Sequence, residues 1–445
     1  MNHRSWHLYQ ALLFILPLPF AGVFPWGWGV FSLLAFISLG LSLASSSTRP
    51  YSIDLPENSV KLINKSRPVI YLLLLAQCLV LLQTLLFDNR HDSYQHLIMG
   101  LSLTAFFVLT LIQLNSRDRI KQAIWVVIIA GSLQALYGSI MVMTGLEWGA
   151  WGAKTSYIDK ATGTFVNRNS LAGYLEMTLA LGIGFLLSQT TRYRGRWQQR
   201  LRQFIQMLLS SKVIMRLLLA VMVIGLVMTR SRMGNTAFFA SLMIAGGLAL
   251  LLMKNKSVST TILLSSLLII DVAIVGTFFG VDKVAERLQG TSIEKESRDE
   301  VSRDTFNMWL DNPILGTGAG SYQYSYPSYR SADVTTDRLY DYAHNDYLQF
   351  LAEFGTLATL LLLLAVLLCF YWGVQAMRLR RDDLFKGLGF AGCMAIVAIA
   401  IHSLVDFNLQ IPANAFMFVF MLAIACIARW SDSGRGGQRR RRTRS

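Results

Sequence analysis

One short stretch, residues 341–355, joins side chains suited to proton transfer to the start of a long apolar run. It reads DYAHNDYLQFLAEFG and places His344, Asn345 and Asp346 directly before that run. Histidine has an unperturbed pKa of about 6.5, so its neutral imidazole can act as a general base near neutral pH. The same residues suit an ordinary helix N-terminus with Asn345 or Asp346 as the cap. Taken alone, the stretch supports a base and a structural turn equally.

Arginines recur in the polar segments of the chain. Guanidinium is planar, permanently charged and suited to bidentate contact with phosphate oxygens. A cavity that held several arginines beside lipid would suit a lipid-linked phosphate or diphosphate. If the diphosphate left during a reaction, the arginines would act most strongly where negative charge develops, and they would also keep a nearby histidine neutral. The candidates are Arg168, Arg230, Arg232, Arg298 and Arg303.

The elements that must position these residues are membrane-spanning helices. Hydrophobic residues make up 53% of the 445-residue chain and charged residues 15%, a balance that is unusual for a water-soluble domain. Apolar stretches of about 20 residues, long enough to cross a bilayer, recur along it. We therefore predict an all-α polytopic membrane protein, with one membrane domain over 1–445 and about twelve spans. Their centres lie near residues 16, 36, 78, 105, 133, 178, 221, 244, 268, 360, 396 and 421.

The N-terminal apolar region, residues 9–46, contains FPWGWG at 24–29, which predicts a break into a helical hairpin. A cleaved signal peptide is disfavoured, because no small-residue cleavage site precedes a polar segment. All four cysteines fall inside apolar spans, so we expect buried free thiols and neither disulfides nor a zinc site. They are Cys78, Cys369, Cys393 and Cys426.

The distribution of basic residues predicts the orientation in the membrane. With both termini in the cytoplasm, the segments on that side hold most of the 41 Lys and Arg residues, as the positive-inside rule requires. RYRGRWQQRLR at 192–202 and the basic tail at 431–445 suit contact with anionic headgroups. The net charge of +15 therefore indicates topology and membrane lipids, and no nucleic-acid partner is expected.

This orientation brings four separate polar stretches to the outer side. They are 163–176, 229–235, the HNDY segment and 402–412. Unpaired polar groups at that depth cost a few kcal/mol each, so they should pair with one another or line a wet cavity. Both possibilities predict one shared site. The supporting candidates are Asn167, Asn169, Asn345, Asp346, His402 and Asp406.

Simpler roles compete for some of these residues. Asn169 or Asn345 can act only as a helix cap. His402 and Asp406, spaced i,i+4, can form a buried structural pair on one helical face that holds the last hairpin, and we favour that interpretation over a chemical role.

A long outer loop, about residues 280–345, separates the ninth and tenth spans. Val301, Phe306, Trp309 and Leu310 recur at roughly helical spacing before Pro313, so we predict an amphipathic helix that caps the bundle. SYQYSYPSYR follows at 321–330, and its tyrosines suit either a carbohydrate platform or an interfacial anchor. The acidic residues beyond it are expected to be solvated, without a metal or other cofactor. They are Asp333, Asp337 and Asp341.

Three stretches resemble the O-antigen ligase and polymerase superfamily. They are GTFVNRNSLAGYL at 163–175, SRMG at 231–234, and the segment from Ser297 to Gly320 that leads into HND. The ligase signature of His-Asn, nine residues and Gly is reproduced by His344, Asn345 and Gly355. The resemblance extends over about 163–415. Two positions depart from the family pattern, Ser170 and Ala358, and the latter weakens the choice of a ligase over its relatives.

The resemblance implies a polytopic glycosyltransferase at the periplasmic face of the bacterial inner membrane. His344 matches the family histidine proposed as the base that activates the acceptor hydroxyl. Arg232 and Arg298 match arginines thought to hold the donor diphosphate, while Arg168 and Arg303 are weaker matches. The implied donor is O-antigen linked to undecaprenyl diphosphate, the implied acceptor is the lipid A core, and no metal is required.

Related enzymes use other acceptors. A polymerase transfers chains to another lipid-linked unit, and a protein O-oligosaccharyltransferase transfers them to Ser or Thr. The His-Asn spacing, the moderate loop and the lack of an appended soluble domain favour a ligase. The non-enzymatic alternative is a transporter of the same lipid, which would need polar residues at mid-membrane depth and often an internal repeat. Asp271 alone makes a poor transport pathway.

Overall fold

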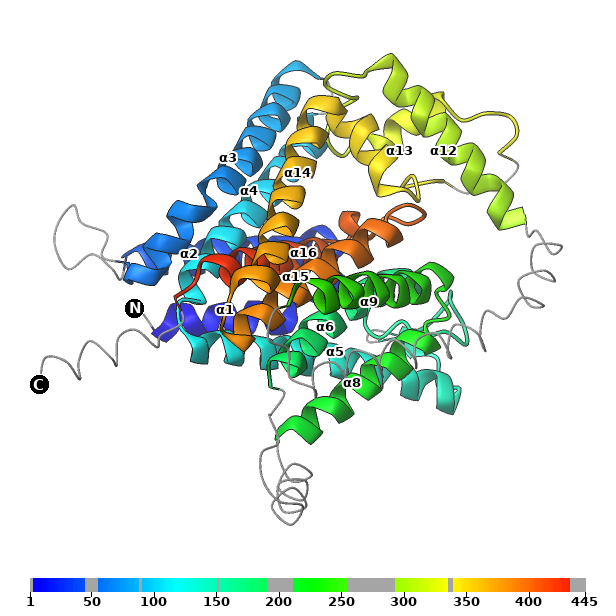
Figure 1. Cartoon of the computed structure of the whole chain (residues 1–445). Coiled ribbons are helices and arrows are strands. Elements are labelled where there is room, and N and C mark those ends of the chain that lie inside the picture. The colour runs from blue at the N-terminus through cyan, green and yellow to red at the C-terminus, as the bar shows by residue number, and fades with distance from the viewer. Residues whose placement is uncertain are drawn as a thin grey trace, which may run out of the picture.

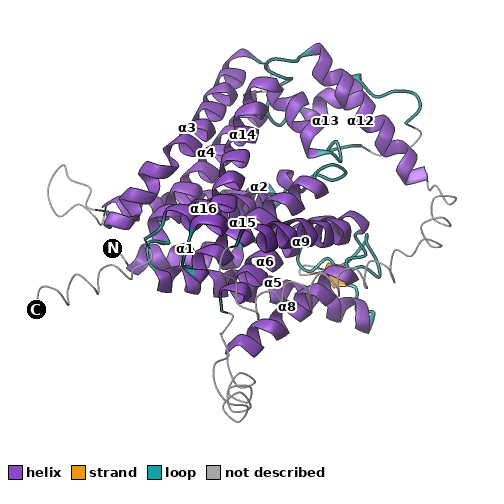
Figure 2. Cartoon of the chain, in the orientation of Figure 1, coloured by secondary structure: helices purple, strands orange, loops and turns teal. Residues whose placement is uncertain are grey.

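The computed structural model describes residues 3–44, 55–87, 90–149, 152–189, 211–253, 293–334 and 339–432. This part of the chain is almost entirely helical (Figure 2), which confirms the all-α prediction. The helices are α1 (His3–Ile15), α2 (Pro25–Ala44), α3 (Glu57–Leu86), α4 (Arg90–Gln113), α5 (Arg117–Thr144), α6 (Arg168–Ser188), α8 (Ser211–Met228), α9 (Arg232–Leu252), α12 (Ile293–Asp311), α13 (Tyr322–Ser325), α14 (Asp346–Leu379), α15 (Asp383–His402) and α16 (Pro412–Trp430). Short 3-10 turns are η1 (Phe20–Gly22), η2 (Tyr326–Ser328) and η3 (Asn408–Gln410), and β1 (Trp148–Gly149) pairs with β2 (Gly152–Ala153).

Nine helices in the described part of the chain are long and apolar enough to cross a membrane. They are α2, α3, α4, α5, α6, α9, α14, α15 and α16, and each contains one of the predicted span centres. The predicted span near 221 is the shorter apolar helix Val213–Met228. The predicted span near residue 16 is not found among the candidate spans of the described residues, because the helix there, α1, has only 13 residues and ends at Ile15. Helix α2 begins at Pro25, as the predicted hairpin requires. The predicted span near 268 lies outside the described residues.

Polar side chains define where several helices begin. Asn167 caps α6 by accepting the Asn169 backbone N–H at 2.8 Å, and Asn345 caps α14 by accepting the Leu348 N–H at 3.1 Å. Ser231 caps α9 in the same manner. These contacts satisfy backbone donors that would otherwise lack a partner. The prediction for Asn345 is confirmed, whereas the cap of α6 is Asn167 and not Asn169.

The centre of the bundle is formed by α6, α15 and α16, whose side chains are mostly buried (Figure 1). Glycines allow α6 and α15 to approach closely. A Cβ on Gly184 would lie 2.3 Å from the carbonyl oxygen of Gly387. Small residues at helix crossings are typical of membrane bundles, where close backbone contact replaces the hydrophobic effect.

The helix connections gather at two opposite ends of the bundle. At the first, which we call the terminal end, the Asn58 side chain donates to the Asn115 carbonyl at 2.7 Å and to Ser431 at 3.0 Å. Gln113 donates to Ser5 at 2.7 Å in the first helix. Both termini of the described chain therefore lie at this end. That it faces the cytoplasm stays a prediction, as does contact of the tail with lipid.

At the opposite end, which we call the site end, the predicted outer segments meet. The Ala161 N–H donates to the Met228 carbonyl at 2.9 Å, which joins the segment before α6 to the end of α8. Gln83 accepts the Ala319 N–H at 3.2 Å, which joins α3 to the long loop. The separation into two ends agrees with the alternation of spans that the sequence predicts.

The long loop forms an ordered cap over α14, within the described residues 293–334 and 339–345 (Figure 1). The predicted helix is α12, which ends at Asp311, just before Pro313. Its predicted apolar face is only partly correct, because Val301 is fully buried while Phe306 and Leu310 are 42% and 52% exposed.

Two of the four tyrosines of this loop do not behave as predicted. Tyr322 and Tyr326 are buried and stacked, with ring centroids 5.3 Å apart, so they build a small core under α12 and do not present a carbohydrate platform or a bilayer anchor. Tyr324 is exposed. The predicted burial is also wrong for one cysteine, because Cys78 is exposed on α3. The other three thiols are buried, and none of the four forms a disulfide.

The glycine of the His-Asn signature breaks helix α14. Gly355 has φ +72°, and a Cβ there would lie 2.2 Å from the Ile314 carbonyl oxygen. The backbone of the long loop crosses the helix at this point, where the Thr317 and Gly318 N–H groups donate to carbonyls of α14 at 2.8 and 3.0 Å. The spacing between the histidine and this glycine therefore sets where the cap attaches to the helix that follows His344.

Candidate functional site

A cavity of about 600 Å³ opens at the site end. It is enclosed by the η1 turn, the segment before α6, the beginning of α12, the residues before α14 and the turn after α15. His344, Arg168 and Arg298, from three separate parts of the chain, share it. The lining residues are Ala21, Val23, Tyr157, Lys160, Phe165, Val166, Asn167, Arg168, Asn169, Ser170, Arg298, Leu339, Tyr340, Asp341, Tyr342, His344, Phe407 and Ile411.

His344 is held in an unusual backbone conformation at the cavity wall. Its φ is +52°, a left-handed value that is uncommon outside glycine. Its ring packs edge-on against Phe407 at 4.9 Å between centroids, and its Nδ1 atom is buried without a hydrogen-bond partner among the described residues. Because the next residue caps α14, the imidazole is fixed where the loop enters the helix.

The electrostatic environment keeps the imidazole of His344 neutral. Burial lowers the pKa of His344 to about 4, the charge of Asp406 opposes this shift, and that of Arg298 adds to it. Desolvation disfavours a charged side chain, so the direction is expected. At neutral pH the ring can therefore accept a proton.

The two cavity arginines come from different elements. Arg168 is the first residue of α6, where its guanidinium lies 5.9 Å from the ring of Tyr157 and donates to the Arg230 carbonyl at 3.3 Å. Arg298 lies in α12 and is half-buried. They bring permanent positive charge to the same cavity as the neutral histidine. This arrangement suits an anionic ligand.

The other three arginines lie elsewhere. Arg230 and Arg232 are exposed at the turn between α8 and α9 and do not line the cavity. Arg303 faces away within the cap, where it binds Asp333 at 3.0 Å and lies 3.8 Å from Asp304. Arg230 still reaches the site indirectly, because its carbonyl accepts the bond from Arg168.

A buried polar network supports the turn after α15. Asp346 accepts from the Ser403 hydroxyl at 2.7 Å and from the Leu409 N–H at 3.0 Å. Asn345 donates to the Leu404 carbonyl at 3.0 Å. These bonds fasten the start of α14 to residues 403–409, so Asn345 and Asp346 position His344 and do not face the cavity.

The predicted pairing of His402 and Asp406 on one helical face is wrong, although both side chains are buried. Helix α15 ends at His402, so the i,i+4 geometry is lost. His402 instead contacts Glu176 of α6 at 2.8 Å, and both side chains are fully buried. Asp406 accepts from the Asn169 side chain and from its neighbouring backbone N–H at 2.9 Å. The predicted shared cluster exists, but with other partners.

Sequence reasoning missed several residues of the site. Lys160 and Tyr157 line the cavity, and their position in the outer segment before Arg168 was the available signal. Glu176 lies seven residues after Asn169 on one face of α6, a spacing that connects it to the same network. Asp271 lies outside the described residues. In the described ranges, no group of three or more His, Cys, Asp or Glu side chains could hold a metal.

One comparison with known proteins gives a match. Residues 217–363 match the family model described as O-antigen ligase, a segment that runs from α8 to the middle of α14 and covers about a third of the chain. It contains Arg230, Arg232, Arg298 and His344, whereas Arg168 precedes it. No curated protein matches the chain. Residues 217–363 are therefore similar to the O-antigen ligase family, in a chain whose described part holds nine helices long and apolar enough to cross a membrane.

Proposed function

We propose that this protein is an O-antigen ligase that transfers O-antigen polysaccharide from undecaprenyl diphosphate to a sugar hydroxyl of the lipid A core. The match to the O-antigen ligase family model supports a ligase or polymerase type of function in general. The observation that carries the finer proposal is the juxtaposition of His344, Arg168 and Arg298 around one cavity. A base and two phosphate-binding cations are the groups that such a transfer needs.

The proposed reaction is a single displacement. His344 accepts the proton of the acceptor hydroxyl, and the resulting oxygen attacks the anomeric carbon of the donor sugar. The bond from that carbon to the diphosphate oxygen breaks, and undecaprenyl diphosphate leaves with the bonding electron pair. Arg168 and Arg298 stabilise the charge that develops on this leaving group. The proton on His344 then passes to solvent.

Donor binding should strengthen the base. Arg298 contributes to the low pKa of His344, so an anionic diphosphate bound beside Arg298 offsets that effect and raises the pKa. Asp406 acts in the same direction. The histidine is therefore neutral before the donor arrives and becomes more basic in the complex.

The remaining arginines fit this proposal unequally. Arg230 and Arg232 stand on the turn that Arg168 contacts through a carbonyl, so they suit an outer part of the diphosphate site. Arg303 is engaged by Asp333 within the cap, and we assign it to the cap. We further propose that the site end faces the periplasm and that the polyprenyl tail of the donor lies between helices.

Complementation tests this function. Cells that lack their native ligase would receive wild type or His344→Ala, and lipopolysaccharide would be separated by gel. We expect wild type to restore long-chain lipopolysaccharide, while the variant accumulates polymer on undecaprenyl diphosphate. Lengthening of the lipid-linked chains by wild type would indicate a polymerase, and glycosylated protein would indicate a protein transferase. Full function of an inserted His344→Ala variant would favour a transporter.

A further inference from the structure

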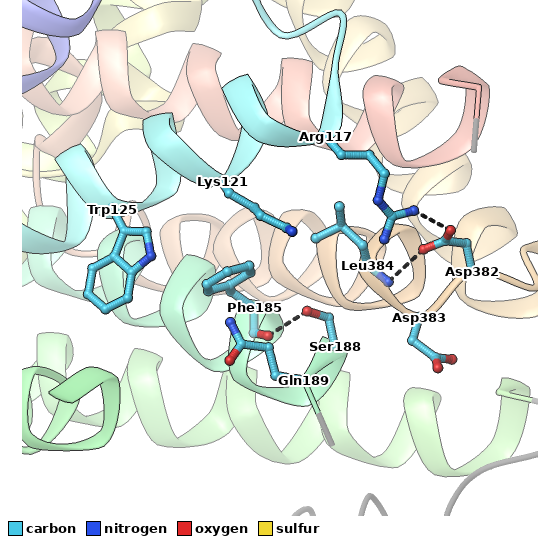
Figure 3. Close-up of a pocket in the computed structure, with 9 residues that line it drawn as sticks. All are labelled: Arg117, Lys121, Trp125, Phe185, Ser188, Gln189, Asp382, Asp383 and Leu384. Carbon is cyan, nitrogen blue, oxygen red and sulfur yellow. Dashed lines mark hydrogen bonds and ion pairs between the residues drawn. The ribbon is translucent and has the colours of Figure 1, made fainter. Parts of the chain in front are cut away.

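A second pocket, of about 400 Å³, lies at the terminal end, where α6 ends, whereas the cavity lies where α6 begins. Figure 3 shows the residues that line this pocket. The beginning of α5, the end of α6 and the beginning of α15 enclose it. These three helices are candidate membrane spans, so the pocket lies where spans end, at the depth of lipid headgroups. Its chemistry is carried by Arg117, Lys121, Trp125, Phe185, Asp382 and Asp383.

Two of the charged side chains in the pocket neutralise each other in an ion pair. Arg117 binds Asp382, and the same carboxylate caps α15 by accepting the Leu384 N–H at 3.0 Å. Asp382 is 9% exposed, so this pair is largely fixed by the fold. It leaves the other guanidinium N–H groups of Arg117 for a ligand.

The remaining two charges have opposite signs. Lys121 has no ionic or hydrogen-bonding partner among the described residues, and Figure 3 shows its ammonium directed toward Phe185 and Leu384. Asp383 is 70% exposed, and its ion pair with Lys386 is long at 3.5 Å. The pocket therefore has a cation and a carboxylate for a ligand, with Trp125 and Phe185 as apolar neighbours.

We propose that this pocket binds the headgroup of a phospholipid that carries both a phosphate and a primary amine. The phosphate is bound by Lys121 and Arg117, and the ammonium by Asp383. A headgroup with a phosphate alone leaves the Asp383 carboxylate without a partner, and a trimethylated amine cannot donate hydrogen bonds to it. The aromatic side chains contact the glycerol and the first carbons of the acyl chains.

Binding here would clamp together helices that also form the site end. Helix α6 begins at Arg168 in the cavity and ends at this pocket, and α15 runs from the pocket to His402. A bound lipid should therefore raise the thermal stability of the whole protein, because it binds the folded state alone.

Lipid binding to delipidated, purified full-length protein tests the proposal. Native mass spectrometry would measure the affinities for phosphatidylethanolamine, phosphatidylglycerol and phosphatidylcholine of equal chain length. We expect wild type to prefer phosphatidylethanolamine over each of the others by about tenfold, the effect of one charge-assisted hydrogen bond. Equal affinity for the three lipids would overturn the proposal.

Three variants separate the two halves of the headgroup site. Lys121→Gln should weaken phosphatidylethanolamine and phosphatidylglycerol alike, and Lys121→Arg should restore both. Asp383→Asn should keep phosphatidylglycerol binding, which also shows that it is folded, and lose the preference for ethanolamine. Lys61→Gln removes a positive charge from the same end outside the pocket and should change nothing. Unchanged binding by Lys121→Gln would contradict the proposal, as would displacement of the lipid by equimolar soluble phosphoethanolamine.

Discussion

The two ends of the bundle use the same residue types in different ways. At the terminal end, Lys61 pairs with Asp432 and Arg117 with Asp382, and the pocket there holds one further cation and one further carboxylate, Lys121 and Asp383. At the site end, Asp346 is buried among neutral donors, while Arg168 and Arg298 line a cavity and Arg298 forms no ion pair with a carboxylate of the described residues. Paired charges close a surface, whereas cations separated from carboxylates can bind an anion. Whether charged side chains are paired therefore indicates a functional site better than their number does.

The largest effect is expected at the histidine. His344→Ala should lower the rate of ligation by about 100- to 10,000-fold, the usual contribution of a general base, while the protein remains inserted and folded. Transfer assayed in membranes with equal amounts of protein measures this effect. If His344 were only part of the N-terminal turn of α14, the rate would stay unchanged. The proposed chemical difference between the two ends would then be wrong.

The second-largest effect is expected at Gly355, the glycine of the His-Asn signature. Gly355→Ala places a side chain at φ +72° and against the Ile314 carbonyl, so we expect a loss of about 2 to 4 kcal/mol in stability. Thermal unfolding in detergent measures it. Gly29→Ala is the matched control, since a Cβ there meets nothing within 4 Å. Equal stability of the two variants would mean that the cap does not depend on this crossing.

The arginines provide a comparison within one helix. Arg298→Ala should weaken use of the lipid donor by about 10- to 100-fold, as expected for lost hydrogen bonds to a charged group. Arg303→Ala, on the same helix but engaged by Asp333, should change donor use less than twofold by the same reasoning. Donor titration at saturating acceptor distinguishes them. Equal losses would argue that charge on α12, and not position, is what matters.

The pH dependence should reflect the low pKa of His344. Because folding lowers this pKa from about 6.5 in the unfolded chain to about 4, the unfolded state binds the proton first as pH falls. The contribution of His344 to stability therefore decreases from pH 6.5 toward pH 4, and the decrease should be absent in His344→Gln. The free energy of unfolding of both proteins, measured as a function of pH, tests this prediction. Parallel curves would contradict the lowered pKa of His344.

The smallest effect is expected at the terminal end. Lys61 and Asp432 are 40% and 55% exposed, so Lys61→Ala should change stability by less than about 1 kcal/mol. Thermal unfolding at low and high salt measures it. A larger, salt-insensitive loss would mean that this end depends on its ion pairs more than its exposure indicates.

Much of the fold could be predicted because hydrophobic length is read directly from sequence. Nine predicted spans are present, and Asn345 caps α14 as one interpretation required. Burial within the cap was harder to predict, because helical spacing did not show which way Phe306 and Tyr326 would face. Tyr326 is buried because it packs with Val301, Met308 and Tyr322, contacts that spacing along the chain does not show.

The candidate site was predictable in its residue types but not in its partners. The outer-side segments indicated that His344, Arg168 and Arg298 would meet, and they share the cavity. The pairing of His402 depended on where α15 ends, which periodicity does not fix to the residue. Its contact with Glu176 joins residues 226 positions apart, a relation that no local pattern contains.

Binding of undecaprenyl diphosphate to purified protein separates the roles assigned to one cavity. We predict that His344→Ala keeps wild-type affinity for this lipid while transfer is lost, and that Arg298→Ala loses affinity about 10- to 100-fold. Wild-type affinity in Arg298→Ala, or weakened affinity in His344→Ala with transfer intact, would contradict a neutral base beside an arginine-bound diphosphate.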